Sequence, residues 1–423
     1  MTGGALIPLA LRSLWDRRGT ALLTVLAVAL AVALLVGVEK LREGTRAAFE
    51  RTITGTDLVV GARSGQLNLL LYSVFRIGDP TNNITWESYQ ALSRRPEVAW
   101  TVPLSLGDSH RGYRVLGTSQ AYFQHYRHGE DRSLVLAEGK VFDDLFDAVL
   151  GAEVARALGY RLGDEIVLAH GIGSVSFADH GDKPFRVAGI LAPTGTPVDR
   201  TVHVSLEAIE AIHLGWESGT RLGRAPQASA DEVRKLELQP KQITAFLVGL
   251  KSRAAALRYQ RVVNTYPEEP LLAIIPGVAL TQLWSVLGVA EKALTAIAVF
   301  VVGVGLLGIL TSILTSLNER RREMAVLRAV GARPWHVIAL LVVESAVLAL
   351  AGAVLGVALV HLALAVGAPL LEARAGLALV GIAPGLFDLA VVGAVTLAAA
   401  GMGLLPALRA YRASVADGLT VRV

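Results

Sequence analysis

The sequence predicts an integral α-helical membrane protein with four transmembrane helices, one followed by three, and a large α+β extracytoplasmic domain after the first helix. Its 423 residues have a mean hydropathy of +0.50, and only 18% are charged, whereas soluble domains have about 25%. Four spans would occupy roughly 80–90 residues. The rest is long enough for a domain with its own hydrophobic core.

Four apolar runs have the length that a bilayer requires. We predict spans at residues 20–38, 286–317, 336–366 and 386–405. Arg12, Arg17 and Arg18 precede the first run, as in a secretory signal peptide, but the run is long for such a signal. We therefore expect an uncleaved first span.

Arginines beside the apolar runs predict the orientation. Segments 1–19, 318–335 and 406–423 together hold eleven basic and four acidic residues. Because cytoplasmic loops carry the excess of Lys and Arg, both termini and loop 318–335 are predicted to be cytoplasmic. Region 39–285 and the short loop 367–385 are then periplasmic.

Region 39–285 has an α+β pattern, with helix-prone stretches at both ends that would extend the adjoining spans as a stalk. Strands are predicted by short β-rich runs bounded by turn residues, at 56–60, 113–116, 165–168, 185–191, 201–204 and 243–250. Helices are predicted at 86–93, 152–158, 206–212 and 252–265.

The sequence offers few residues for catalysis or for metal binding. It contains no cysteine, which excludes disulfides, thiolate metal sites and a cysteine nucleophile. His125 and His128 have the spacing of two ligands on one helix face, and further candidates are scattered, namely His170, His180, Asp182, His203 and His213. Since no third ligand stands at a recognisable spacing, we predict no metal site.

No enzymatic motif is present either. Ser109 and His110 lie near Asp108, but no nucleophile-elbow motif surrounds them. A phosphate-binding loop is also absent, since Gly139-Lys140 lacks the first glycine and the hydroxyl residue. We therefore expect a non-catalytic chain that binds no cofactor and no nucleic acid.

The predicted cytoplasmic loop has features that a basic loop which only anchors two spans would not require. It reads Glu319-Arg320-Arg321-Arg322-Glu323-Met324-Ala325-Val326-Leu327-Arg328-Ala329-Val330-Gly331-Ala332. As a short helix it would place Met324, Leu327 and Val330 on one apolar face, with Gly331 as a C-cap. An anchor would explain the arginines, but neither the apolar face nor the two glutamates.

This loop resembles the cytoplasmic coupling helix of the MacB/FtsX/LolC-type ABC transporter permeases, the type VII mechanotransmission superfamily. The segment Pro406-Ala407-Leu408-Arg409-Ala410-Tyr411-Arg412 is similar to the closing motif of that family. Gly151-Ala152-Glu153-Val154-Ala155, Gly163-Asp164 and the run at 185–191 are similar to its MacB-like periplasmic core domain. The arrangement of one plus three spans also agrees.

The resemblance implies a permease subunit in the bacterial inner membrane that transmits the motion of a separate ATPase to the periplasmic domain, for export or extraction of a substrate. Two permease subunits, expected as a homodimer, would bind two ATPase copies that carry ATP and Mg, and a periplasmic adaptor and membrane lipid are further expected partners. ATPase-coupling residues would be Glu319, Arg320, Arg322, Glu323, Leu327, Arg328, Gly331 and Ala332. A heterodimer, a LolC-like lipoprotein-extracting subunit and an FtsX-like subunit signalling to a cell-wall hydrolase stay open as alternatives, although this domain is large for an FtsX insert.

A few polar and small residues inside the spans are also noteworthy. Glu344, His361 and Asp388 are ionisable, and such residues in a membrane are functional candidates. For Glu344 we favour a structural hydrogen bond within the bundle. Gly352 and Gly356 form a small-xxx-small pair that predicts close helix packing.

Overall fold

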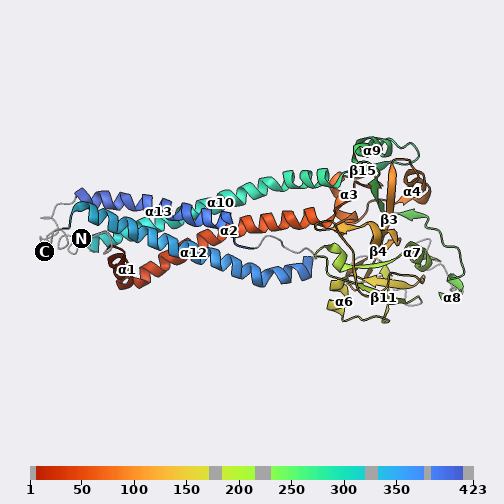
Figure 1. Ribbon diagram of the computed structural model, residues 1–423, viewed down its shortest axis with the longest axis horizontal. Helices are drawn as coiled ribbons and strands as arrows, with labels where there is room; N and C mark the ends of the chain where they lie inside the picture. The colour runs from red at the N-terminus through yellow and green to blue at the C-terminus, as the bar shows by residue number, and fades with distance from the viewer. Residues whose placement is uncertain (1–5, 171–182, 215–229, 320–331, 376–382, 413–423) are drawn as a thin grey trace. The chain divides into compact units, whose positions relative to one another are not determined.

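The computed structural model describes residues 6–170, 183–214, 230–319, 332–375 and 383–412 (Figure 1). The chain forms two compact units. The helical unit comprises residues 1–44, 288–368 and 381–423, and the large domain comprises residues 45–287 and 369–380.

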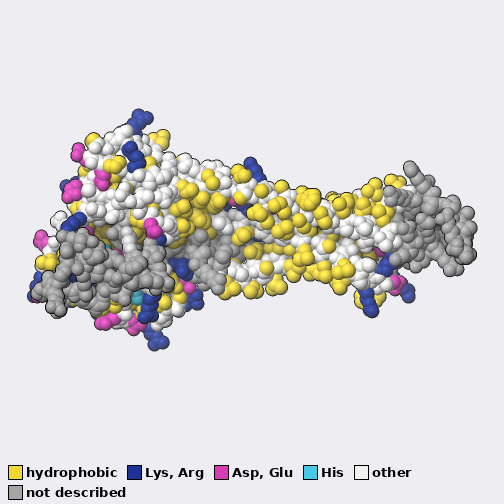
Figure 2. Space-filling view, turned by 180° about the vertical axis from the view of Figure 1, so that it is seen from behind, with side chains coloured by type: hydrophobic (Ala, Val, Ile, Leu, Met, Phe, Trp, Pro, Cys, Tyr) yellow, Lys and Arg dark blue, Asp and Glu magenta, His cyan; other side chains and the backbone are white. Residues whose placement is uncertain are grey.

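Long apolar helices make up the helical unit. Its helices are α1 (Leu6–Asp16), α2 (Arg18–Thr52), α10 (Pro276–Glu319), α12 (Pro334–Ala375) and α13 (Leu386–Arg412). Within the described residues, four of them are long and apolar enough to cross a membrane, over Arg18–Thr52, Pro276–Thr315, Trp335–Leu370 and Leu386–Leu408. Each predicted span lies inside one of these helices. Figure 2 shows hydrophobic side chains over much of the visible surface of these helices. Many apolar side chains of the bundle are exposed, such as Phe300 at 73% and Leu397 at 74%.

Helix α12 packs closely against α2 at Gly352 and Gly356, the pair for which the sequence predicted close helix packing. A Cβ atom built on Gly352 would lie 2.7 Å from Val28 Cβ, and one built on Gly356 would lie 2.5 Å from the carbonyl oxygen of Ala29. Real Cβ atoms do not approach so closely. Only glycine therefore permits this contact, and the bundle core beside it includes Val28 and Val32, both almost fully buried.

We expect Gly356→Leu to destabilise the helical unit by about 3 kcal/mol, because overpacking of a tight contact costs about 1–3 kcal/mol. Gly367→Leu is the matched control, since a Cβ on this glycine of the same helix has no neighbour within 4 Å. Both changes raise helix propensity, so the control should be neutral or slightly stabilising. Thermal unfolding of the full chain in detergent measures the difference, and equal midpoints would contradict the tight contact.

Two predicted helix ends were wrong. Helix α12 continues to Ala375 with Pro369 inside it, so the predicted loop at 367–385 starts in helix. Helix α13 continues through Pro406 to Arg412. A proline removes one helical hydrogen bond, and packing compensates for this loss at Pro406, where the next residue, Ala407, is fully buried in the bundle core.

The described part of the large domain is built on a mixed sheet of eleven strands. Its main path runs in the order β15 (Leu271–Ile274), β1 (Leu58–Ala62), β14 (Ala245–Leu250), β3 (Val98–His110), β4 (Tyr113–Thr118), β12 (Thr201–Ser205), β8 (Asp147–Leu150), β11 (Phe185–Leu191) and β7 (Leu136–Gly139). Strands β9 (Glu165–Ile166) and β10 (Ala169–His170) pair beside this path. Two small sheets join β2 (Ile84–Thr85) with β13 (Gln242–Ile243) and β5 (Arg127–His128) with β6 (Arg132–Ser133). The neighbours β4 and β12, and likewise β8 and β11, are parallel, while the other pairs on the path are antiparallel.

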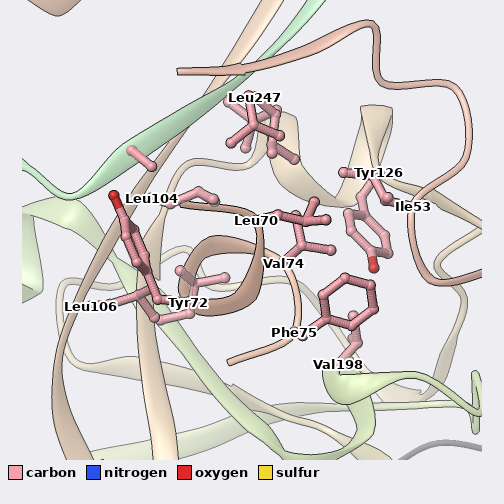
Figure 3. Packing of buried hydrophobic residues seen from close by; sticks show 14 of the residues in the cluster. Ile53, Leu70, Tyr72, Val74, Phe75, Leu104, Leu106, Tyr126, Val198 and Leu247 are labelled. Atoms are coloured by element: carbon pink, nitrogen blue, oxygen red, sulfur yellow. The ribbon is translucent and has the colours of Figure 1, made fainter. Parts of the chain in front are cut away.

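Short helices cover the sheet and close separate parts of the core. They are α3 (Gln66–Ser73), α4 (Trp86–Ser93), α5 (Ala121–His125), α6 (Ala152–Leu158), α7 (Leu206–His213), α8 (Ala230–Val233) and α9 (Ala256–Asn264). One cluster places Tyr89 of α4 and Tyr259 of α9 against β1 and β14. Another packs α6 and α7 on β8, β11 and β12. The third cluster, shown in Figure 3, gathers Leu70 and Val74 with Leu104, Leu247 and Tyr126.

Candidate functional site

The predicted coupling residues Arg320, Arg322, Glu323, Leu327, Arg328 and Gly331 lie outside the described residues, and the structure describes only the ends of the segment. Helix α10 ends at Glu319, and Ala332 lies two residues before Pro334, where α12 begins. Pro334 occupies the first helical position, where proline is favoured. The backbone N–H of Arg333 donates to His336 Nδ1 at 3.1 Å. A histidine side chain thus satisfies a free N–H group at the start of α12, which anchors the C-terminal end of the coupling segment.

Glu344 has a hydrogen-bond partner from another helix. Its side chain is 3% exposed, and Ser13 Oγ of α1 donates to Glu344 Oε1 at 3.3 Å. This contact joins α12 to the helix that precedes the first span. It is the kind of structural hydrogen bond that the sequence led us to favour.

His361 and Asp388 meet in the helical unit together with Lys40, which the sequence analysis did not single out. Asp388 Oδ2 lies 3.2 Å from His361 Nε2 and 3.4 Å from Lys40 Nζ, and it accepts the N–H of Gly385 at 2.8 Å. Lys40 Nζ also donates to the carbonyl of Ala383 at 3.1 Å. The network ties α2 to α12 and α13. The signal that could have identified Lys40 is its position two residues after the uncharged apolar run 20–38.

The two stalk helices connect directly to neighbouring strands of the sheet. Helix α2 ends at Thr52 and β1 begins at Leu58, while β15 ends at Ile274 and α10 begins at Pro276. Strands β1 and β15 are antiparallel partners, with Val59 opposite Ile274. The α2 linker is itself fixed, because Thr54 N–H donates to the carbonyl of Arg127 and Asp57 N–H to that of Val248. Little flexible chain therefore separates either helix from the sheet.

Aromatic packing holds the stalk helices together where they enter the large domain. The ring centroids of Phe49 of α2 and Trp284 of α10 lie 5.7 Å apart in an edge-to-face pair. The ring centroids of Phe49 and Phe75 lie 4.4 Å apart. The Arg46 guanidinium lies 5.8 Å from the Trp284 ring. Farther along the same helices, Arg42 approaches Glu291 at 3.9 Å. The stalk is thus a packed helix pair.

Among the described residues, the histidines of the large domain form no shared ligand set. Helix α5 ends at His125, because Tyr126 has an extended backbone, and His128 lies in β5. The two histidines do not share a helix face, and His125 instead stacks on Trp100 at 4.8 Å. No group of three His, Asp or Glu side chains suited to a metal ion occurs in the described ranges. His180 and Asp182 lie outside those ranges, as does the side chain of His170.

Two other histidines, His203 and His110, are buried in the protein core, and His213 is partly exposed. His203 is fully buried with Nδ1 3.2 Å from the carbonyl of Val149, and burial lowers its pKa to about 3. His110 contacts the carbonyl of Val167 at 2.7 Å and Tyr160 Oη at 3.0 Å, and burial lowers its pKa as well. His213 lies 3.7 Å from Asp108. In the segment Asp108-Ser109-His110, the histidine thus contacts Val167 and Tyr160 as part of the folded domain.

Two family models match most of the chain. The model for the MacB-like periplasmic core domain matches residues 21–251, and that for the FtsX-like permease C-terminal domain matches residues 295–415. The first match includes α2 and most of the large domain. The second includes α12, α13 and most of the transmembrane part of α10.

Curated relatives match along most of this chain. The pyoverdine export ATP-binding/permease protein PvdT of Pseudomonas syringae pv. tomato is 27% identical, over 98% of this chain and 59% of its own length. The macrolide export ATP-binding/permease protein MacB of Bordetella avium is 26% identical, over 99% of this chain and 60% of its own length. The chain thus spans about three-fifths of the length of these relatives.

Among solved structures, the periplasmic region of MacB from Actinobacillus actinomycetemcomitans is 12% identical, with a TM-score of 0.35, and covers 55% of this chain and 94% of its own. This structural similarity is too weak to support an argument, and the assignment to a family rests on the two family models that match the sequence. With four membrane-spanning helices and a large periplasmic-type domain, this chain belongs to the family of MacB/FtsX-type ABC transporter permeases.

Proposed function

We propose that this chain is the membrane subunit of an ABC transporter and transmits ATP-driven motion of a separate ATPase subunit to its periplasmic domain. The observation that carries the proposal is the direct connection of α2 and α10 to the paired strands β1 and β15. Helices are stiff over this length, and ladder hydrogen bonds join the two strands. A movement of the helix pair is therefore passed to the sheet rather than absorbed in a loop.

We assign ATP binding to a separate ATPase subunit, because the printed sequence contains no Gly-x4-Gly-Lys-[Ser/Thr] segment. The curated relatives are named ATP-binding/permease proteins. We propose that two ATPase copies, with ATP and Mg, bind two copies of this chain through the coupling segment from Glu319 to Ala332. Both termini and this segment would lie in the cytoplasm.

The direction of work that we propose is export, or extraction of a substrate from the inner membrane or periplasm. The curated relatives are named for pyoverdine and macrolide export. Lys40 and Asp388 are buried, and together with His361 they are engaged in contacts between helices, so we propose that these charges hold the bundle together rather than line a polar path. A periplasmic adaptor would then receive the substrate from the large domain.

The division of labour predicts that the purified chain alone hydrolyses no ATP. Hydrolysis is expected only when an ATP-binding-cassette partner is added, and it should stop when the catalytic glutamate of that partner is changed to Gln. Phosphate release from matched preparations measures this. Hydrolysis by the lone chain that survives repeated purification would contradict the proposal.

The proposed orientation predicts which single cysteines an impermeant thiol reagent labels on spheroplasts. The cysteine-free sequence gives no background. Glu207→Cys, at an exposed position of α7, should be labelled, whereas Val415→Cys should be labelled only after the membrane is opened. Thr118 is unsuitable as an outside probe because it is fully buried. The reverse pattern would overturn the orientation.

A further inference from the structure

A groove in the helical unit has one buried carboxylate in its wall. Its volume is about 570 Å³, and it is lined mainly by apolar residues of α12 and α13, including Val354, Val357, Leu389 and Val392. Gly385 and Asp388 also line it. Volumes of about 300–1,000 Å³ are typical of sites that bind small molecules.

Asp388 has one satisfied and one free carboxylate oxygen. The residue is 3% exposed, and its contacts with Lys40, His361 and the Gly385 N–H all go to Oδ2. Oδ1 is buried and has no hydrogen-bond partner among the described residues. Buried acceptors are normally paired, so a free carboxylate oxygen at an apolar groove indicates a missing hydrogen-bond donor.

The position of the groove along the helices indicates what kind of molecule supplies that donor. Asp388 is the third residue of α13, and Lys40 follows the uncharged run 20–38 by two residues. Both therefore lie where the apolar part of the bundle ends, at the level of lipid head groups. Val392 lies one turn deeper, about 6 Å along the helix, and Val354 lies about two turns from His361 towards the middle of α12. The apolar wall thus extends into the hydrocarbon region.

We propose that this groove binds a phospholipid whose head group donates a hydrogen bond to Asp388 Oδ1 and whose acyl chain lies along Val354 and Val392. An ethanolamine head group meets the requirement, because its ammonium carries N–H donors. A choline head group has the same charge but no donor. The lipid would thereby join α12 to α13 beside the Lys40–Asp388–His361 network.

The test compares dioleoyl phosphatidylethanolamine with dioleoyl phosphatidylcholine, added to the delipidated full chain and counted by native mass spectrometry. Hydrogen bonds to charged groups are among the stronger ones, so we expect about tenfold tighter binding of the ethanolamine lipid. In the Lys40→Met/Asp388→Leu double variant this preference should disappear. Replacing both charges by apolar residues leaves no unpaired buried ion, so the bundle should keep its fold.

A second pair of variants tests the acyl-chain part of the site. Val354→Phe should fill the groove and weaken binding of both lipids, whereas Val299→Phe on α10 should change neither. Val354 is 53% and Val299 is 56% exposed, so the pair is matched. Equal binding of the two lipids by the unaltered chain, or a preference that persists in the double variant, would overturn the proposal. Disulfide cross-linking of Leu389→Cys between two copies would also overturn it, because a protein helix would then cover the groove.

Discussion

Leu327→Asp is expected to abolish binding of the ATPase while leaving the chain folded and inserted. In the proposed coupling helix, Leu327 would lie on the apolar face and would be buried against the ATPase. Truncating a buried anchor at an interface costs about 2 kcal/mol or more, and 1.4 kcal/mol is already about tenfold in affinity. Aspartate adds the cost of placing a charge in an apolar contact, so we expect a loss of more than a hundredfold.

Arg321→Gln is the control for this experiment. It changes a residue of the same segment that we did not assign to coupling, and it removes one of several positive charges that set topology. Copurification of the ATPase and stimulation of its hydrolysis should be nearly unchanged in this variant. Normal assembly and hydrolysis in the Leu327→Asp protein, at matched expression, would mean that the segment only anchors two spans.

The sequence predicted the elements of the large domain best where local signals and packing agree. Helix α4 begins after Thr85, whose hydroxyl accepts the N–H of Ser88, and α7 begins after Ser205 in the same way. Helix α6 ends at Gly159, which has a φ of 73°. These caps are visible in the sequence, and the predicted ranges 86–93 and 152–158 agree with the structure.

Strand β3 was missed because its sequence has the marks of a loop. Pro103 and Gly107 interrupt the pattern, and both residue types are depleted in strands. The pairing with β4 accommodates them through a shift of register between Leu106 and Ser109. Its strand partners are β4, which follows directly in a hairpin, and β14, which lies more than 130 residues farther along the chain, so the pairing with β14 could not be seen in the local sequence.

The network at Asp388 shows why the sequence could identify single unusual residues of a site but not which residues meet there. Single-residue reasoning identified His361 and Asp388 as unusual, because ionisable groups are rare in membrane spans. It could not pair them with Lys40, since Lys40 belongs to α2 and lies more than 300 residues from both. Contacts of this kind depend on which helices pack together, and Gly352 and Gly356 predicted close packing without indicating the partner helix.

Stiffness of the stalk is the property on which the proposed function depends most. The chain passes from the helical unit into the large domain after Gly44 in α2 and returns after Leu287 in α10. A seven-residue Gly/Ser insert at both points would replace stiff helix by flexible chain. A seven-residue Ala/Glu/Lys-rich helical insert is the matched control, because it adds nearly two whole turns, about 10 Å, and keeps the helices continuous.

The most direct measurement is the ATP-dependent change in distance between spin labels at Glu207→Cys in two copies of the chain, assembled with the ATPase. We expect the change in the unaltered chain and in the chain with helical inserts. With flexible inserts, ATP hydrolysis should continue, but the distance between the labels should no longer respond to nucleotide. An unchanged nucleotide-dependent response with flexible inserts would contradict transmission of motion through α2 and α10.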